Sequence, residues 1–300
     1  AGMAYMAEGS LKNLKKAQKM YEASLKIRKS LAEKRNTIES WRDLGIGYVK
    51  MGEVYEAQEG PENLRCAQRM YEESLVILKV LSEMRRTPES SRDLSISYEK
   101  MGIVYEMQGG RENLERALEM YEKCLEIRKE VSEKQRTAVS FRDLHLSYLR
   151  VGTMYEARGG QQNLRRAQEM CEKSLQLAEA LLKEQGTAES LHDLFVCCDT
   201  TGRIYEAQGD HENQKKAQQM YEKSMQLAGI LANKLKTVES YDEWAVSLAR
   251  TAAFPLTAPE MSRRCLKTML SISEILYQST GSTLYQEYME YAKEMLDVLS

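Results

Sequence analysis

The sequence is poor in the residues that interrupt helices or favour strands. Its 300 residues include only 4 prolines, 3 phenylalanines and 2 tryptophans, whereas charged residues make up 29%. Good helix formers such as Leu, Glu, Ala, Lys and Gln are frequent. We therefore expect an all-α protein with few strands.

The chain also lacks an excess of charge of either sign. Lys and Arg number 43 against 45 Asp and Glu, which gives a formal net charge of -2. No global field would therefore hold the protein on nucleic acid or on an anionic membrane. Residues 1–36 are locally basic, but their cations fall mainly on the polar face of one helix. We interpret that face as solvated and expect neither nucleic acid nor membrane as a partner.

Long apolar runs are missing as well. No stretch approaches the ~18 consecutive apolar residues of a membrane span, and no charged segment followed by an apolar core indicates a signal peptide. These absences predict a cytoplasmic location.

The six cysteines do not follow the spacing of a disulfide framework or a metal site. They replace other residues of a repeat instead. Cys124 occupies the position held by Ser24, Ser74, Ser174 and Ser224, and Cys171 and Cys198 stand where other copies have tyrosine. We interpret them as buried free thiols that pack as small apolar side chains.

Residues that could carry catalysis are also scarce. The three histidines, His145, His192 and His211, have no Cys, His or carboxylate at ligand spacing in a cluster. Neither a Walker-type loop nor a G-x-G-x-x-G turn is present, and nothing suggests a nucleophile with a base and an oxyanion site. We predict that the chain is not an enzyme and needs no metal or cofactor.

What the sequence does contain is a period of 50 residues. Shifting the chain by 50 aligns it with itself through most of its length without gaps. The aligned positions include Asn13, Asn63, Asn113, Asn163 and Asn213; Met20, Met70, Met120, Met170 and Met220; and Thr37, Thr87, Thr137, Thr187 and Thr237. A fixed period of this size is typical of stacked repeat architectures.

Each copy is predicted to form two long helices. In the copy at 87–136, Thr87 is a suitable N-cap and Pro88 suits the first helical position, so the first helix should span 88–108. Gly109 and Gly110 should end it, because glycine permits the positive φ that a helix C-terminus often needs. The second helix should begin near residue 112 or 113 and end near residue 135.

Both helices are amphipathic. One apolar stripe consists of Leu94, Tyr98, Met101 and Tyr105, and a broader one of Leu114, Ala117, Tyr121, Cys124, Leu125 and Val131. Neither stripe can be buried within a single pair of helices, so the sequence predicts that neighbouring pairs stack.

The residues in this repeat resemble a known family. Tyr98, Met101, Gly102 and Tyr105, followed by Ala117, Tyr121 and Cys124, are similar to the large, apolar, small and aromatic pattern of the tetratricopeptide repeat (TPR). The resemblance covers residues 1 to about 250, in a variant extended to 50 residues. It implies an α-solenoid of stacked antiparallel helix pairs in a right-handed superhelix, with the first helices lining a concave face.

The period also predicts the organisation of the chain. Residues 1–36 form a partial first repeat, since Gly2 and Tyr5 align with Gly52 and Tyr55 and place the start inside a first helix. Residues 37–250 hold four full helix pairs and the first helix of a fifth. Pro255 should stop that helix. Residues 251–300 then form a degenerate last repeat, with helices near 259–279 and 281–299. We expect the last helix either to cap the stack or to open a further repeat.

Positions on the side of the first helices opposite the stripe divide into two kinds. Some stay constant between copies, such as Glu56, Glu106, Glu156 and Glu206, or Arg42, Arg92 and Arg142 with His192. Others change, and we predict partner contacts there because stacking repeats itself whereas a ligand does not. The candidates are Val49, Glu53, Ser95, Ile96, Glu99, Ile103, His145, Leu146, Leu149, Thr153, Phe195, Asp199 and Arg203.

Three functions are compatible with this sequence. We favour a non-enzymatic scaffold that binds a protein or peptide segment in the concave groove. The alternative is a sensor or regulatory domain of a larger signalling protein, such as an NTPase or transcriptional regulator. A purely structural, self-associating array is the third. For Ile46, Ile96, Leu146 and Val196, packing against a neighbouring first helix competes with a role in gripping a partner.

Overall fold

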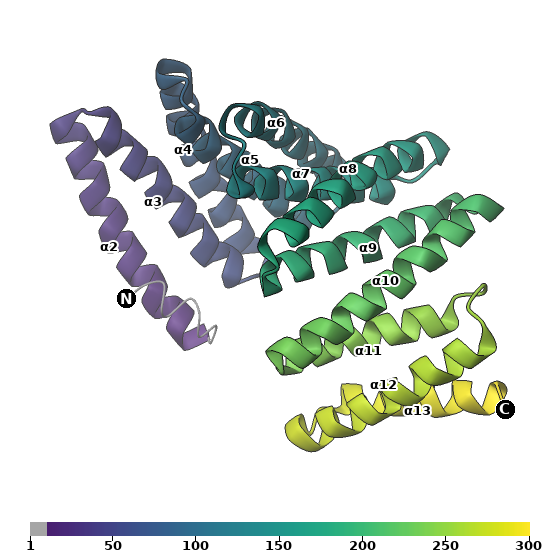
Figure 1. The fold of residues 1–300 in the computed structure, drawn as a ribbon. Coiled ribbons are helices and arrows are strands. Elements are labelled where there is room, and N and C mark those ends of the chain that lie inside the picture. The colour runs from purple at the N-terminus through teal and green to yellow at the C-terminus, as the bar shows by residue number, and fades with distance from the viewer. Residues whose placement is uncertain (1–10) are drawn as a thin grey trace. The chain divides into compact units, whose positions relative to one another are not determined.

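The computed structural model describes residues 11–300, with side chains from Lys12 onward, and this part of the chain holds twelve helices and no strand. Figure 1 shows their order: α2 (Leu11–Arg35), α3 (Ile38–Ala57), α4 (Pro61–Arg85), α5 (Pro88–Gln108), α6 (Arg111–Gln135), α7 (Ala138–Arg158), α8 (Gln161–Gln185), α9 (Ala188–Gln208), α10 (His211–Leu235), α11 (Val238–Ala253), α12 (Pro259–Thr280) and α13 (Thr283–Val298).

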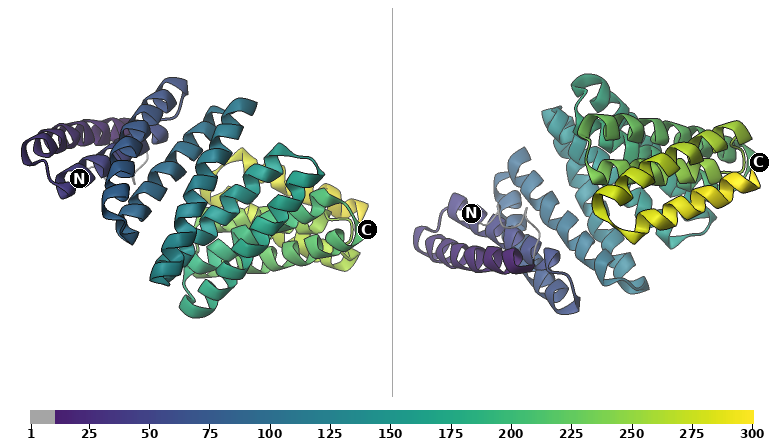
Figure 2. Two further views of the ribbon diagram at one scale, coloured as in Figure 1. Left: turned by 90° about the horizontal axis from the view of Figure 1, so that it is seen from above. Right: turned by 90° about the horizontal axis from the view of Figure 1, so that it is seen from below.

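The chain divides into two compact units, residues 1–154 and 155–300. In the first unit, helices α2 to α6 each pack against the next one along the chain, and in the second unit α8 to α13 do the same. Both views of Figure 2 show these successive antiparallel neighbours within each unit. The all-α prediction is confirmed, and the fold is an α-solenoid of helix pairs. We call α3, α5, α7, α9 and α11 the first helices, and the helices that follow them the second helices.

The helix that carries the Thr87 N-cap begins and ends as predicted, at Pro88 and Gln108. Thr87 Oγ1 accepts a hydrogen bond from the backbone N–H of Ser90, and Ser90 Oγ accepts one from the backbone N–H of Thr87. This reciprocal pair satisfies two N–H groups that a helix start otherwise leaves unbonded. The same Thr-x-x-Ser box begins α3, α9 and α11.

The turn between the two helices of a pair depends on positive φ. Gly109 has φ 64° and Gly110 has φ 83°, a region that glycine enters without steric cost. The second helix follows directly as α6, beginning at Arg111. The glycine pair therefore ends one helix and starts the next, as the sequence predicts.

A glycine and a tyrosine fix the distance between the two helices of a pair. A Cβ atom at Gly102 would lie 2.5 Å from Cε1 of Tyr121, and one at Gly202 would lie 2.7 Å from Cε1 of Tyr221. Both tyrosines are buried. Any larger residue would push the helices apart, which gives the glycine of the repeat a packing reason.

The C-terminal helices also agree with the expectation from Pro255. Helix α11 ends at Ala253, two residues before this proline, and Phe254 turns inward to pack edge-on against Tyr221 at 5.4 Å between ring centroids. Helices α12 and α13 follow and share a buried cluster that includes Leu266, Met269 and Tyr285. The role of α13 as a cap stays a prediction. The predicted start within a first helix rests on Gly2 and Tyr5, which lie outside the described residues.

The cysteines behave as packing residues. Five are buried and free, namely Cys124, Cys171, Cys197, Cys198 and Cys265, while Cys66 is half-buried. Burial raises the pKa of the Cys124 and Cys197 thiols to about 11. A thiol with such a pKa stays protonated and unreactive at neutral pH.

Candidate functional site: the surface of the first helices

Five of the thirteen predicted contact residues are buried, and we correct the candidate surface accordingly. They are Val49, Ser95, His145, Leu149 and Phe195. Their side chains are not available to a partner in this structure. The other eight are half-buried: Glu53, Ile96, Glu99, Ile103, Leu146, Thr153, Asp199 and Arg203.

The position shared by Gly45 and Ser95 faces the second helix of its own pair. A Cβ at Gly45 would lie 2.9 Å from Cγ of Leu78, so the glycine makes room for this leucine. In the next copy Ser95 stands opposite Arg128, whose Nε donates to Ser95 Oγ at 3.3 Å. The residue at this position therefore varies with the size and polarity of the side chain that it packs against on the second helix. Contact with a ligand is not needed to explain the variation.

The apolar position at Ile96 has a packing role too. Ile96 lies against a buried cluster that includes Val49 and Val104, from two neighbouring first helices, and Tyr71. For Ile96 the structure therefore supports a role in packing between first helices, in preference to contact with a partner.

The constant arginines bind carboxylates of the next first helix. Arg42 Nε donates to Asp93 Oδ2 at 2.5 Å, and Arg92 Nε donates to Asp143 Oδ2 at 2.6 Å. In each case the partners are 51 residues apart, which is one repeat plus one residue. The sequence indicates these pairs through the Arg-Asp dipeptide that recurs at 42–43, 92–93 and 142–143. The arginine of each dipeptide can bind the aspartate of the next copy, and its aspartate can bind the arginine of the preceding copy.

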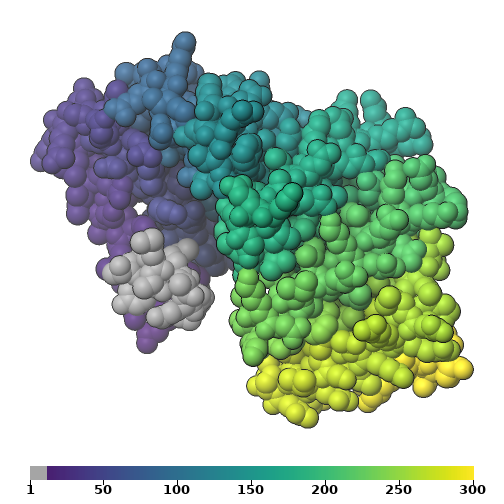
Figure 3. Space-filling model, viewed as in Figure 1, coloured from purple at the N-terminus to yellow at the C-terminus, as the bar shows by residue number. Residues whose placement is uncertain are grey.

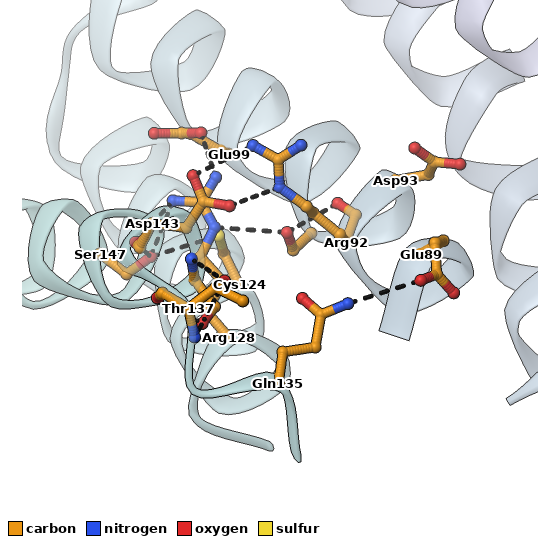
Figure 4. Close-up of polar contacts among 12 residues, drawn as sticks. Glu89, Arg92, Asp93, Glu99, Cys124, Arg128, Gln135, Thr137, Asp143 and Ser147 are labelled. Atoms are coloured by element: carbon orange, nitrogen blue, oxygen red, sulfur yellow. Dashed lines mark hydrogen bonds and ion pairs between the residues drawn. The ribbon is translucent and has the colours of Figure 1, made fainter. Parts of the chain in front are cut away.

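Glu99 belongs to a polar network on α5, α6 and α7, and Figure 4 shows the part of it around Arg128. It accepts from Arg128 Nη2 at 2.6 Å and from Arg150 Nε at 3.2 Å. Burial alone would raise the pKa of Glu99, but the two guanidinium groups outweigh it and leave this pKa below its usual value. Arg128 is itself buried and also donates to Ser147 Oγ at 2.9 Å.

In the second unit the variable charges pair in the same way. Asp199 forms an ion pair with Arg250 of the next first helix. Arg203 Nη1 donates to Glu156 Oε1 at 2.9 Å. Burial raises the pKa of Glu156, an effect that Arg203 only partly opposes.

The constant glutamates bind within their own copy. Tyr71, Tyr121 and Tyr221 donate their hydroxyls to Glu56, Glu106 and Glu206 at 2.6, 2.8 and 2.5 Å. Two of the constant glutamates also pair with cations of an adjacent copy: Glu56 lies 3.7 Å from Lys100, and Glu156 binds Arg203. The tyrosine contact was not anticipated from the sequence.

These ion pairs present their cations outward. In the five arginine–carboxylate pairs between consecutive first helices, the arginine side chains are 34 to 43% exposed and the carboxylates 13 to 23%. The arginines are Arg42, Arg92, Arg150, Arg203 and Arg250. Each compact unit therefore shows guanidinium groups on its first helices, although the net charge of the chain is close to zero.

Other kinds of site find no support in the described part of the chain. Residues 11–300 contain no group of three or more His, Cys, Asp or Glu side chains that could hold a metal ion. No helix among them is both long and apolar enough to cross a membrane.

Comparison with solved structures identifies the architecture. No protein-family model and no curated protein sequence matches the chain. A signal-transduction ATPase (STAND) with a tetratricopeptide repeat sensor from Pyrococcus horikoshii matches with a TM-score of 0.61 and 17% identity. The match covers 96% of this chain but only 38% of that protein.

Two further structures agree over nearly their full length. The nuclear import adaptor Nro1 of S. pombe has a TM-score of 0.60 at 12% identity and covers 93% of both chains. The apo form of RapI has a TM-score of 0.59 at 15% identity, covering 98% of this chain and 94% of that one. The fold is that of the helical-repeat proteins. This helical-repeat protein resembles part of that ATPase in fold, and the 50-residue repeat remains a feature of its own sequence.

Proposed function

We propose that this helical-repeat protein is a non-enzymatic scaffold that binds an acidic, partly apolar protein segment on the surface of its first helices. Its resemblance in fold to an import adaptor and to a TPR sensor supports an interaction role of this kind. The observation that carries the proposal is the outward-facing guanidinium groups on the first helices, above all those of Arg42 and Arg92.

Arg42 and Arg92 show how these groups can bind a partner. Each uses Nε and Nη2 to bond its aspartate. Among the described residues, Nη1 of either arginine has no hydrogen-bond partner, and both side chains are 43% exposed. A carboxylate of a partner can therefore bind the free edge of the guanidinium without breaking the pair beneath it. Such charge-assisted hydrogen bonds are stronger than neutral ones.

The spacing of the helices suggests the form of the partner. Neighbouring packed helices lie about 8 to 10 Å apart. An extended chain advances about 3.3 Å per residue, so acidic residues roughly three apart would meet Arg42 on α3 and Arg92 on α5. Ile103, half-buried on α5, lies about 16 Å along the helix from Arg92 and offers a separate apolar contact.

A peptide-display selection on the immobilised protein tests this proposal. We expect enrichment of peptides with Asp or Glu at about every third position and with Leu or Ile beyond the acidic stretch. The double variant Arg42→Gln/Arg92→Gln should lose these peptides. Arg69→Gln, on the exposed face of α4, is the matched control and should keep them. Enriched peptides that bind the double variant and the wild type equally would refute the assignment, as would a selection that enriches none.

A sensor region of a longer signalling protein is the second candidate. The observation in its favour is that the chain covers 38% of the signal-transduction ATPase, whose name includes a TPR sensor. Sequencing the complete reading frame tests it. An adjoining NTPase or DNA-binding domain is expected, and a frame that encodes no further domain would exclude this candidate.

A further inference from the structure

The second unit contains a cavity of about 860 Å³ between α10 and α12, with α11 as its floor. Trp244 and Leu248 of α11 form this floor, and Met225 of α10 and Met261 of α12 line the sides. In the space-filling view of Figure 3, α10 and α12 both contribute to the surface that faces the viewer. The cavity lies between two second helices, over the first helix α11, and contains none of the thirteen first-helix contact residues.

Two residues that break the repeat accompany this cavity. Trp244 stands where the other copies have Leu44, Leu94, Leu144 and Leu194, and Gly229 stands where they have Lys29, Lys79, Lys129 and Glu179. A Cβ at Gly229 would lie 3.0 Å from Cε2 and 3.1 Å from Nε1 of Trp244. The glycine thus leaves room for the indole, and this pair of residues is absent from the other aligned positions of the repeat.

The polar groups around the cavity are donors and cations. Arg264 and the indole N–H of Trp244 have no hydrogen-bond or ion-pair partner among residues 11–300, and Lys234 donates only to the carbonyl of Gly186 at 3.4 Å. No acidic side chain lines the cavity. The site therefore combines an apolar floor with unused positive charge, which favours a ligand with the complementary arrangement.

We propose that this cavity binds a small amphipathic organic anion, with an aliphatic or aromatic body and one carboxylate. Small-molecule sites typically have volumes of about 300 to 1,000 Å³, with mostly apolar walls and a few placed polar groups. The body of the ligand packs on Trp244 and Leu248. Its carboxylate binds the guanidinium of Arg264 on the α12 side of the cavity.

Titration with dodecanoate, below its micelle concentration, tests the proposal. The protein has two tryptophans, so the Trp41→Phe background makes Trp244 the sole reporter of its fluorescence. We expect a saturable change in emission, and binding of dodecanol at least tenfold weaker because it lacks the charge. Arg264→Gln should weaken dodecanoate binding roughly tenfold. Lys267→Gln is the matched control, one turn away on the exposed side of α12, and should change little.

A cavity-filling variant tests the location. Thr268 lines the cavity from α12, so Thr268→Phe should abolish binding while the helical circular dichroism stays unchanged. Equal affinity for the acid and the alcohol, equal effects of Arg264→Gln and Lys267→Gln, or no saturable signal would each overturn the proposal. Binding of an acidic peptide in place of dodecanoate would overturn it as well and assign the cavity to a protein partner. The Arg42→Gln/Arg92→Gln variant should bind dodecanoate normally, which separates this test from that of the first-helix surface.

Discussion

The hydroxyl of Tyr121 donates a hydrogen bond to the carboxylate of Glu106, with 2.8 Å between Oη and Oε2. The ring of this tyrosine is buried against Gly102. Its hydroxyl is the only polar group of the side chain, and Glu106 accepts its hydrogen bond. Two other copies repeat the contact through Tyr71 and Tyr221. The glycine, the tyrosine and the glutamate thus form one unit of packing within each of these repeats.

Removing the hydroxyl should destabilise the protein measurably. In Tyr121→Phe the ring and its contact with Gly102 remain, but the charge-assisted hydrogen bond to Glu106 is lost. Hydrogen bonds to charged groups contribute about 1.5 to 3 kcal/mol. We expect a loss near the lower value, because Glu106 is exposed and water can replace the donor. Urea unfolding of the two proteins measures the difference.

Tyr105→Phe provides the control for this prediction. Tyr105 is half-buried, and its hydroxyl has no hydrogen-bond partner among residues 11–300. Its removal should change the free energy of unfolding by less than about 0.5 kcal/mol. Similar losses for Tyr121→Phe and Tyr105→Phe would show that the contact with Glu106 contributes nothing.

The same tyrosines predict a loss of stability in alkali. Burial, together with the nearby glutamates, raises the pKa of Tyr71 and Tyr221 above the ordinary value of about 10. A group whose pKa is higher in the folded state stabilises that state fully below the unfolded pKa, and the contribution falls as the pH rises. The melting temperature should therefore drop as the pH rises above about 10. A variant with phenylalanine at positions 71, 121 and 221 should show a shallower drop, and parallel curves for the two proteins would contradict the explanation.

The fold could be predicted from the sequence because each signal is local or strictly periodic. Thr87, Pro88 and the glycine pair at 109–110 determine where α5 begins and ends, and the period of 50 gives the order of the helices. Pro255 likewise acts on its own helix. Such features need no knowledge of which residues meet across the stack.

The candidate surface was harder to predict because pairing across the stack decides it. Ser95 and Glu99 differ from the matching Gly45 and Val49, and this difference alone cannot separate ligand contact from packing. The structure shows that Arg128 is the reason for both. The signal was present in the sequence as a coupled change, since Arg128 stands where the earlier copy has Leu78. This coupled change can be interpreted only when it is known that residues 95, 99 and 128 face one another.

Because positions 95, 99 and 128 change together, replacing all three with the residues of the preceding copy should be tolerated better than replacing one. Glu99→Val alone should cost about 3 kcal/mol or more, because it leaves the buried guanidinium of Arg128 without its carboxylate. Adding Arg128→Leu and Ser95→Gly reproduces the Gly45, Val49 and Leu78 set of the preceding copy. Well-packed apolar residues often replace a buried ion pair without loss, so the triple variant should recover most of the stability. The double variant that keeps Ser95 is the control and should recover less, because a Cβ there would lie too close to the new leucine, as at Gly45.

Unfolding in acid provides an independent check of the same set of residues. The pKa of Glu99 is lowered in the folded protein, so its contribution is present above the unfolded value of about 4.3 and is lost as the pH falls. Urea unfolding at pH 7 and pH 3 should therefore show a smaller loss in acid for the triple variant than for the wild type. A triple variant no more stable than Glu99→Val would show that the three positions do not act as one unit.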